Sequence, residues 1–217
     1  RGSKKYEWIL EPVYGTRNLL TVIIDPEGGV NSKFQEQIDD SFNADANSLK
    51  DYFHVVSGGR LEIKKAATLG TYEAEHAGEL TDGEEDYKNG KNFDCDAGAE
   101  FNSSTNALHA EALLNAEDEF DFKQYDTNND GIIEPSELAI IIAIARDSNS
   151  GSSINTSFKP YCSGDTFTVD GMEIAETVHL NVIYEAGGLS DEQKTENMMV
   201  AVHELGHHIL GFDDLYG

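Results

Sequence analysis

The apolar run LAIIIAIA at residues 138–145 constrains the fold more than any other feature of the sequence. It is the longest run of its kind, and it is far shorter than the roughly 18 apolar residues that a membrane-spanning helix needs. Its β-branched isoleucines also disfavour a helix. We therefore expect a strand at this position and no membrane span in the chain.

Three further segments predict strands. RNLLTVIID at 17–25 predicts a buried strand that ends at Pro26, and another strand resumes at 60–64. TVHLNVIYE at 177–185 alternates apolar with polar residues, which is typical of a half-exposed strand at the edge of a sheet.

Four segments with apolar residues at helical spacing predict helices. Two of them begin at capping boxes, formed by Ser32 with Gln35 and by Ser190 with Gln193. The predicted helices cover 32–42, 47–56 (capped by Asn47 or Ser48), 105–124 and 190–210, and their inward-facing residues are Phe34, Ile38 and Phe42; Leu49, Tyr52, Phe53 and Val56; Leu108, Ala112 and Leu113; and Met198, Met199, Val202 and Leu205.

Strands and helices alternate along the chain, which predicts an α/β fold with helices packed on one twisted mixed sheet. We expect one domain over residues 1–217. Two segments lack such periodicity: 70–104 predicts a long surface excursion, and 147–157 predicts a flexible linker or loop.

Charge narrows the choice of partners. The chain has 41 acidic and 15 basic residues, for a formal net charge of −26. A surface this negative repels the phosphate backbone of nucleic acids. We therefore exclude nucleic acid as a partner. It suits a protein exported into a salty or calcium-containing medium, and we expect an extracellular location. Cys95 and Cys162 could then form one disulfide, and two unpaired thiols are the alternative.

The segment His203-Glu204-Leu205-Gly206-His207 points to a metal site. Two histidines four residues apart project from one face of a helix about 6 Å apart, so both imidazoles can reach one zinc ion. Zinc activates a water for hydrolysis, and Glu204 is placed to take the proton of that water as a general base. The pattern can arise by chance, but the capped helix and its apolar face favour the functional interpretation.

A hydrolytic zinc site usually takes a third protein ligand and leaves one position open. The residues after the helix supply the candidates, because Gly211 lets the chain turn back toward the metal. Asp213 and Asp214 are adjacent, so their side chains diverge and only one of them can bind easily. His208 lies about 100° around the helix from His207 and should miss the metal.

HELGHHILGFDDLYG at 203–217 is similar to the HExxHxxGxxD block of secreted bacterial metalloproteases of the immune inhibitor A type, which are zincins close to the metzincins. NSLKDYFHVVSGGRLEI at 47–63 resembles a second stretch of that family, in which a helix leads to a glycine turn and a strand. Together with the strand before them, these segments extend the resemblance over most of the chain from about residue 17. It implies a zincin catalytic domain with His203, His207 and an aspartate as zinc ligands and Glu204 as base.

The family places a glycine three residues after the second histidine, whereas Gly211 comes four residues after His207. Counting from the histidine selects Asp213, and counting from the glycine selects Asp214. We choose Asp214 because the glycine turn sets the local geometry. The sequence stops before the methionine turn of the family, so we expect a C-terminal subdomain that this sequence does not contain.

Residues 126–137 (DTNNDGIIEPSE) match the twelve-position EF-type calcium loop. An ordinary Asx-rich turn uses the same residue types and is the alternative. The predicted Ca²⁺ ligands are Asp126, Asn128 and Asp130 through side-chain oxygens, Ile132 through its carbonyl and Glu137 through both carboxylate oxygens.

These features predict a secreted, monomeric zinc metalloendopeptidase that hydrolyses protein and peptide substrates, with catalytic Zn²⁺ and structural Ca²⁺. The substrate would lie extended along the strand at 177–185 by strand addition. One alternative is a zinc- and calcium-binding module without activity. Another is a zinc hydrolase that acts on non-peptide bonds.

Overall fold

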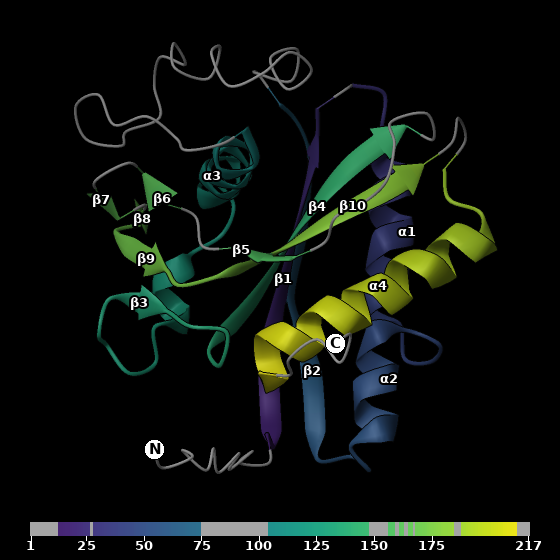
Figure 1. Cartoon of the computed structure of the whole chain (residues 1–217), viewed down its shortest axis with the longest axis horizontal. Coiled ribbons are helices and arrows are strands. Elements are labelled where there is room, and N and C mark those ends of the chain that lie inside the picture. The colour runs from purple at the N-terminus through teal and green to yellow at the C-terminus, as the bar shows by residue number, and fades with distance from the viewer. Residues whose placement is uncertain are drawn as a thin grey trace, which may run out of the picture.

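A computed structural model describes residues 13–26, 28–74, 104–147, 156–158, 161–162, 165–166, 168–184 and 188–211. These residues form an α/β fold around a mixed five-stranded sheet with helices on both faces (Figure 1). The strands are β1 (Gly15–Asp25), β2 (Leu61–Glu73), β4 (Leu138–Asp147), β5 (Thr156–Phe158) and β10 (Thr177–Tyr184). Their order is β2-β1-β4-β10-β5, and β5 alone among them runs antiparallel to its neighbour.

The predicted strand at 138–145 is confirmed as β4, the central strand of the sheet. Its residues from Leu138 to Ala145 are at most 1% exposed. A parallel strand covered on both faces needs apolar side chains at every position, which explains the unbroken run. The strand at 17–25 is confirmed as β1, and the strand predicted at 60–64 is confirmed but continues to Glu73.

The prediction that 177–185 forms a half-exposed edge strand is wrong. β10 lies between β4 and β5, and residues Thr177–His179 pair with β5. Val178, Leu180 and Val182 are buried on one face, while Thr177 and His179 are buried on the other. The alternation in the sequence therefore separates two covered faces. β5 begins within the segment 147–157 that was predicted as a flexible linker or loop, so no local pattern predicted a strand beside β10.

One face of the sheet is covered by α1 (Ser32–Asn43), α2 (Leu49–Val56) and α4 (Asp191–Leu210). The predicted core residues of α1 are buried, but Asn31 rather than Ser32 caps the helix. In α2, Ser48 is the cap, and Leu49 and Phe53 are buried as predicted. Three residues predicted to face inward are instead exposed, because their helices pack through a narrower stripe: Tyr52 (38%), Val56 (59%) and Met199 of α4 (51%).

The opposite face is covered by α3 (Ser104–Glu117) and a small sheet of β3 (Ile132–Ile133), β9 (Met172–Ile174) and β8 (Thr168–Val169). The helix predicted over 105–124 ends at Glu117, and a separate 3-10 turn, η3 (Phe122–Tyr125), follows it. Leu108, Ala112 and Leu113 are buried as predicted. A two-stranded ribbon of β6 (Tyr161–Cys162) and β7 (Asp165–Thr166) completes the described strands.

No helix within the described residues is both long and apolar enough to cross a membrane.

Candidate metal centre

The candidate metal ligands lie in the last two turns of α4. The predicted capping box of Ser190 and Gln193 is present at the start of this helix. At its end Gly211 takes a left-handed φ of 65°, which glycine adopts without steric cost. The HELGH segment therefore lies on continuous helical backbone whose start and end both follow from local sequence signals.

His203 and His207 turn their rings toward each other. Their Nε2 atoms are 3.0 Å apart, and the rings are nearly perpendicular with centroids 4.6 Å apart. Two imidazole nitrogens bound to one tetrahedral zinc ion, each at about 2.0–2.1 Å, lie about 3.3 Å from each other. The pair therefore fits zinc after a small adjustment. His203 is exposed and His207 is half-buried, so an ion between them would be open to solvent on one side.

Glu204 lies between these histidines and the packed side of α4. The residue is only 7% exposed, although its neighbour His203 is exposed. A rotation of about 100° per residue separates the two side chains around the helix. A carboxylate at this boundary is one residue away from the candidate ligands and covered by protein, a position compatible with the predicted base.

The third zinc ligand stays a prediction, because Asp213 and Asp214 lie outside the described residues. Within the described part, no group of three or more His, Cys, Asp or Glu side chains is placed to hold a metal ion. The described part of α4 therefore supplies two candidate zinc ligands, the Nε2 atoms of His203 and His207. Cys95 also lies outside the described residues, so the possible disulfide with Cys162 is not tested.

His208 connects the end of α4 to the sheet. Its side chain is fully buried, and its Nδ1 atom is 3.4 Å from Oε2 of Glu176, the residue directly before β10. The structure thus places His208 in the packing, away from the exposed His203. Glu176 was not among the predicted site residues, since no local pattern relates it to a histidine in a helix far along the chain.

On the opposite face of the sheet, a second pair of histidines was also missed by the sequence. His109 of α3 and His179 of β10 are buried, with His109 Nε2 2.9 Å from His179 Nδ1. His109 Nδ1 lies 2.7 Å from Oγ1 of Thr177. If the hydroxyl donates to His109, then His109 donates to His179, and two neutral rings satisfy the chain of bonds. If both rings were protonated, the N–H at His109 Nε2 and the N–H at His179 Nδ1 would face each other, and no hydrogen bond could form between the rings.

Burial is the main cause of the low basicity of this pair. It holds the pKa of His109 well below the ordinary value of 6.5, and the neighbouring His179 adds to the effect. Burial lowers the pKa of His179 to about 4, the charge of Arg146 lowers it further, and a hydrogen bond with Asn181 opposes the shift. Both rings are therefore neutral at neutral pH.

The candidate calcium loop forms the backbone turns that its sequence predicts. Asp126 accepts hydrogen bonds from the N–H groups of Asp130 at 3.1 Å and Gly131 at 3.0 Å. Asn128 Oδ1 accepts from the same Asp130 N–H at 2.9 Å. Gly131 has a φ of 83°, as the sharp turn at position 6 requires. Ile133 is buried and pairs with β9.

Glu137 lies across the start of this loop. Its Oε1 atom accepts from Thr127 N at 2.8 Å and Thr127 Oγ1 at 2.7 Å, and its Oε2 atom accepts from Glu134 N at 3.3 Å. Although partial burial opposes it, these hydrogen bonds hold the pKa of Glu137 below its usual value. The Asx-turn alternative accounts for the bonds of Asp126 and Asn128 without an ion, and Glu137 bonds to protein groups only, so a calcium ion stays a prediction. To bind one, Glu137 would exchange some of these partners for the cation.

Removal of calcium tests this loop. At calcium a hundredfold above its dissociation constant, binding stabilises the native state by about 2.7 kcal/mol. For a chain of this size that corresponds to about 5 °C or more in the unfolding midpoint. We expect a selective calcium chelator, at buffered zinc, to lower the midpoint by this amount in differential scanning calorimetry.

Two matched variants test whether the change in the unfolding midpoint comes from the candidate calcium loop. Glu137→Gln should abolish the response to the chelator, whereas Asp118→Asn, a change at an exposed carboxylate outside the loop, should retain it. A melting curve of the unmodified protein that does not move with the chelator would contradict a calcium site.

No protein-family model matches the chain, and a search of curated protein sequences finds no match. The resemblance carried by residues 203–217 and 47–63 therefore stays a prediction.

Proposed function

We propose that this protein is a zinc metalloendopeptidase, secreted and monomeric, with a zincin-like fold. The observation that carries the proposal is the facing pair of His203 and His207 Nε2 atoms, 3.0 Å apart on a capped helix, with Glu204 between them in sequence. A mixed sheet with this helix packed on one face supports it. His203, His207 and Asp214 would hold the ion.

The proposed reaction is hydrolysis of a peptide bond by water. Zinc, when bound, polarises the scissile carbonyl and makes the attacking water more acidic. Glu204 accepts a proton from that water and then donates it to the leaving amine nitrogen as the C–N bond breaks. His203 and His207 bind as neutral imidazoles, which makes the loaded state sensitive to acid.

Substrate would add to the sheet as an extended strand. It cannot pair with Thr177–His179, because β5 already occupies that edge of β10. Among the described strands, β5 is the outermost on this side of the sheet, and it contacts α4. The outer edge of β5 is therefore the position that we propose for a substrate main chain.

Zymography on casein, with and without a zinc chelator, tests this proposal. We expect cleavage that is lost with the chelator and restored by stoichiometric zinc. One bound zinc with no cleavage would instead indicate a zinc- and calcium-binding module without activity. Turnover of small ester or amide substrates but not of casein would indicate a hydrolase of non-peptide bonds.

The third ligand can be assigned by two adjacent variants. We expect Asp214→Ala to weaken zinc binding by about a hundredfold or more, because a ligand is lost. Asp213→Ala should weaken it less, within the range of about 10–100-fold that is typical of a residue that only orients a ligand. Competition with a colorimetric zinc indicator measures both, and the reverse order would assign the ligand to Asp213.

A further inference from the structure

Among the described strands, β2 is the outermost on the side of the sheet opposite β5. The direction of its main-chain groups follows from its pairing with β1. The N–H of Gly15 donates to the carbonyl of Arg60 at 2.8 Å, with Gly15 opposite Leu61. Main-chain groups alternate in direction along a strand. Those of Glu62 and Lys64 therefore face β1, and those of Leu61, Ile63 and Lys65 face away from the sheet.

Side chains bond to the outward-facing main chain of β2 at two places, and a short gap without such bonds lies between them. Ser57 Oγ accepts from the N–H of Leu61 at 2.9 Å and lies 3.4 Å from its carbonyl oxygen. Farther along, Gln35 Nε2 donates to the carbonyl of Thr68 at 2.9 Å. Between them, within the described residues, nothing outside the sheet bonds to the main chain of Ile63 or Lys65. The gap therefore presents two N–H donors and two carbonyl acceptors.

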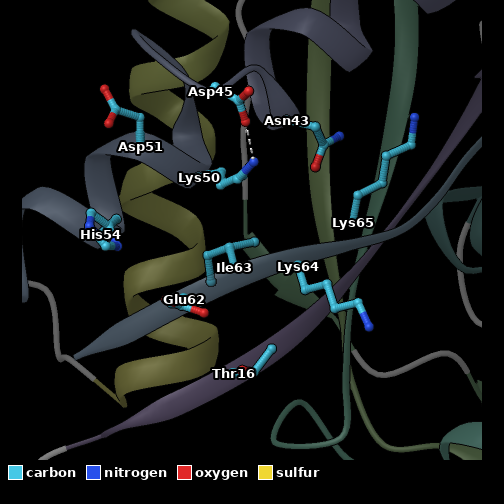
Figure 2. A pocket seen from close by; sticks show the side chains of 10 residues that line it. All are labelled: Thr16, Asn43, Asp45, Lys50, Asp51, His54, Glu62, Ile63, Lys64 and Lys65. Carbon is cyan, nitrogen blue, oxygen red and sulfur yellow. Dashed lines mark hydrogen bonds and ion pairs between the residues drawn. The ribbon is translucent and has the colours of Figure 1, made fainter. Parts of the chain in front are cut away.

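A cavity of about 620 Å³ lies along this gap. Residues 62–65 of β2 and Thr16 of β1 form one wall. The end of α1, the segment after it and α2 form the other, through Asn43, Asp45, Lys50, Asp51 and His54 (Figure 2). We call this cavity the edge groove. The side chain of Ile63 is only 2% exposed, so the wall formed by β2 is anchored in the core.

The charges that line the edge groove balance each other, unlike those of the whole chain. Lys50, Lys64 and Lys65 match Asp45, Asp51 and Glu62 in number, whereas the chain carries −26. Lysines on an edge strand often hinder pairing with another strand. Here Lys65 Nζ is held 2.7 Å from Asp39 on α1, and Figure 2 shows Lys64 and Lys65 pointing to opposite sides of β2, which leaves the edge accessible.

We propose that the edge groove binds an extended peptide segment, which adds to β2 as a further strand. The main-chain groups of Ile63 and Lys65 pair with the peptide, and the polar walls accept polar side chains at alternate positions. Because the lining has no net charge, a peptide of low net charge suits it best and salt should affect binding weakly. The site is independent of the metal centre.

The probe is an acetylated, amidated octapeptide of alternating threonine and glutamine, added to the zinc-loaded Glu204→Gln variant so that cleavage cannot occur. We expect ¹⁵N–¹H NMR shifts at Ile63 and Lys65, with hydrogen exchange of these two amides slowed tenfold or more. The same peptide N-methylated at every residue should bind at least tenfold more weakly, because it lacks the donors that pair with β2.

Two variants at one position separate main-chain pairing from side-chain effects. Lys65→Pro removes an outward N–H without removing a bond to β1 and should weaken binding tenfold or more. Lys65→Gln loses the ion pair with Asp39 but keeps that N–H, and should bind within about threefold of the parent.

Three results would overturn the proposal: no response of residues 61–65 at millimolar peptide, equal binding of the N-methylated peptide, or shifts confined to α4 and β5. The N-methylated peptide keeps the test decisive if Lys65→Pro fails to fold.

Discussion

Glu204→Gln is expected to lower the rate of peptide hydrolysis by about a thousandfold or more while the protein still binds one zinc. Glutamine has the shape of glutamate but cannot take the proton of the attacking water, and general-base catalysis contributes about 10²–10⁴ in rate. Glu204 is not one of the candidate zinc ligands, and because glutamine keeps its shape we expect both imidazoles to stay in place. Cleavage of a fluorogenic peptide and metal analysis of the same sample measure the two quantities.

The matched control is Glu196→Gln, which changes an exposed carboxylate on the same helix. It should retain full activity, because it removes the same charge from α4 without touching the candidate centre. Near-normal hydrolysis by Glu204→Gln would contradict the assignment of Glu204 as the general base. Loss of zinc from that variant would show instead that Glu204 supports the metal.

The second large effect concerns the buried pair of His109 and His179. Their pKa values are lowered in the folded state, so between about pH 4 and 6.5 the unfolded chain binds more protons than the native protein. Stability must then rise with pH across this window and fall on acidification. For His179 alone, the change from 6.5 to about 4 corresponds to about 3 kcal/mol.

Urea unfolding of the metal-free protein at several pH values between 7.5 and 4.5 measures this loss. In a His179→Asn variant the dependence on pH should shrink by about 2–3 kcal/mol, although the variant is less stable at pH 7.5. His54→Asn, at an exposed histidine of α2, should leave the dependence unchanged. An NMR titration in which His179 gains its proton near pH 6.5 would contradict the prediction.

Local sequence patterns predicted the elements that depend on local forces. The apolar run at 138–145, the capping box at Ser190 and the left-handed turn at Gly211 each act within a few residues, and each occurs where it was predicted. The same holds for the turns of the candidate calcium loop. The facing histidines also follow from local geometry, since a spacing of four residues on any α-helix brings two side chains together.

The tertiary structure decided which segments become neighbours. β5 covers part of the edge of β10, Glu176 meets His208, and His109 meets His179 across one face of the sheet. The helices also bury fewer apolar residues than the sequence predicted, since Tyr52 and Met199 were expected to face inward but are exposed.

The sequence by itself thus determined where α1, α2, α4 and the strands β1, β4 and β10 lie, and it placed His203 and His207 one helical turn apart, because short-range hydrogen bonds and side-chain spacing fix these features. Only the tertiary structure decided the order of the described strands, the position of β2 as the outermost of them on its side, and the buried pair of His109 and His179. These contacts join residues far apart in the chain, and a local sequence pattern does not determine which distant residue a side chain contacts.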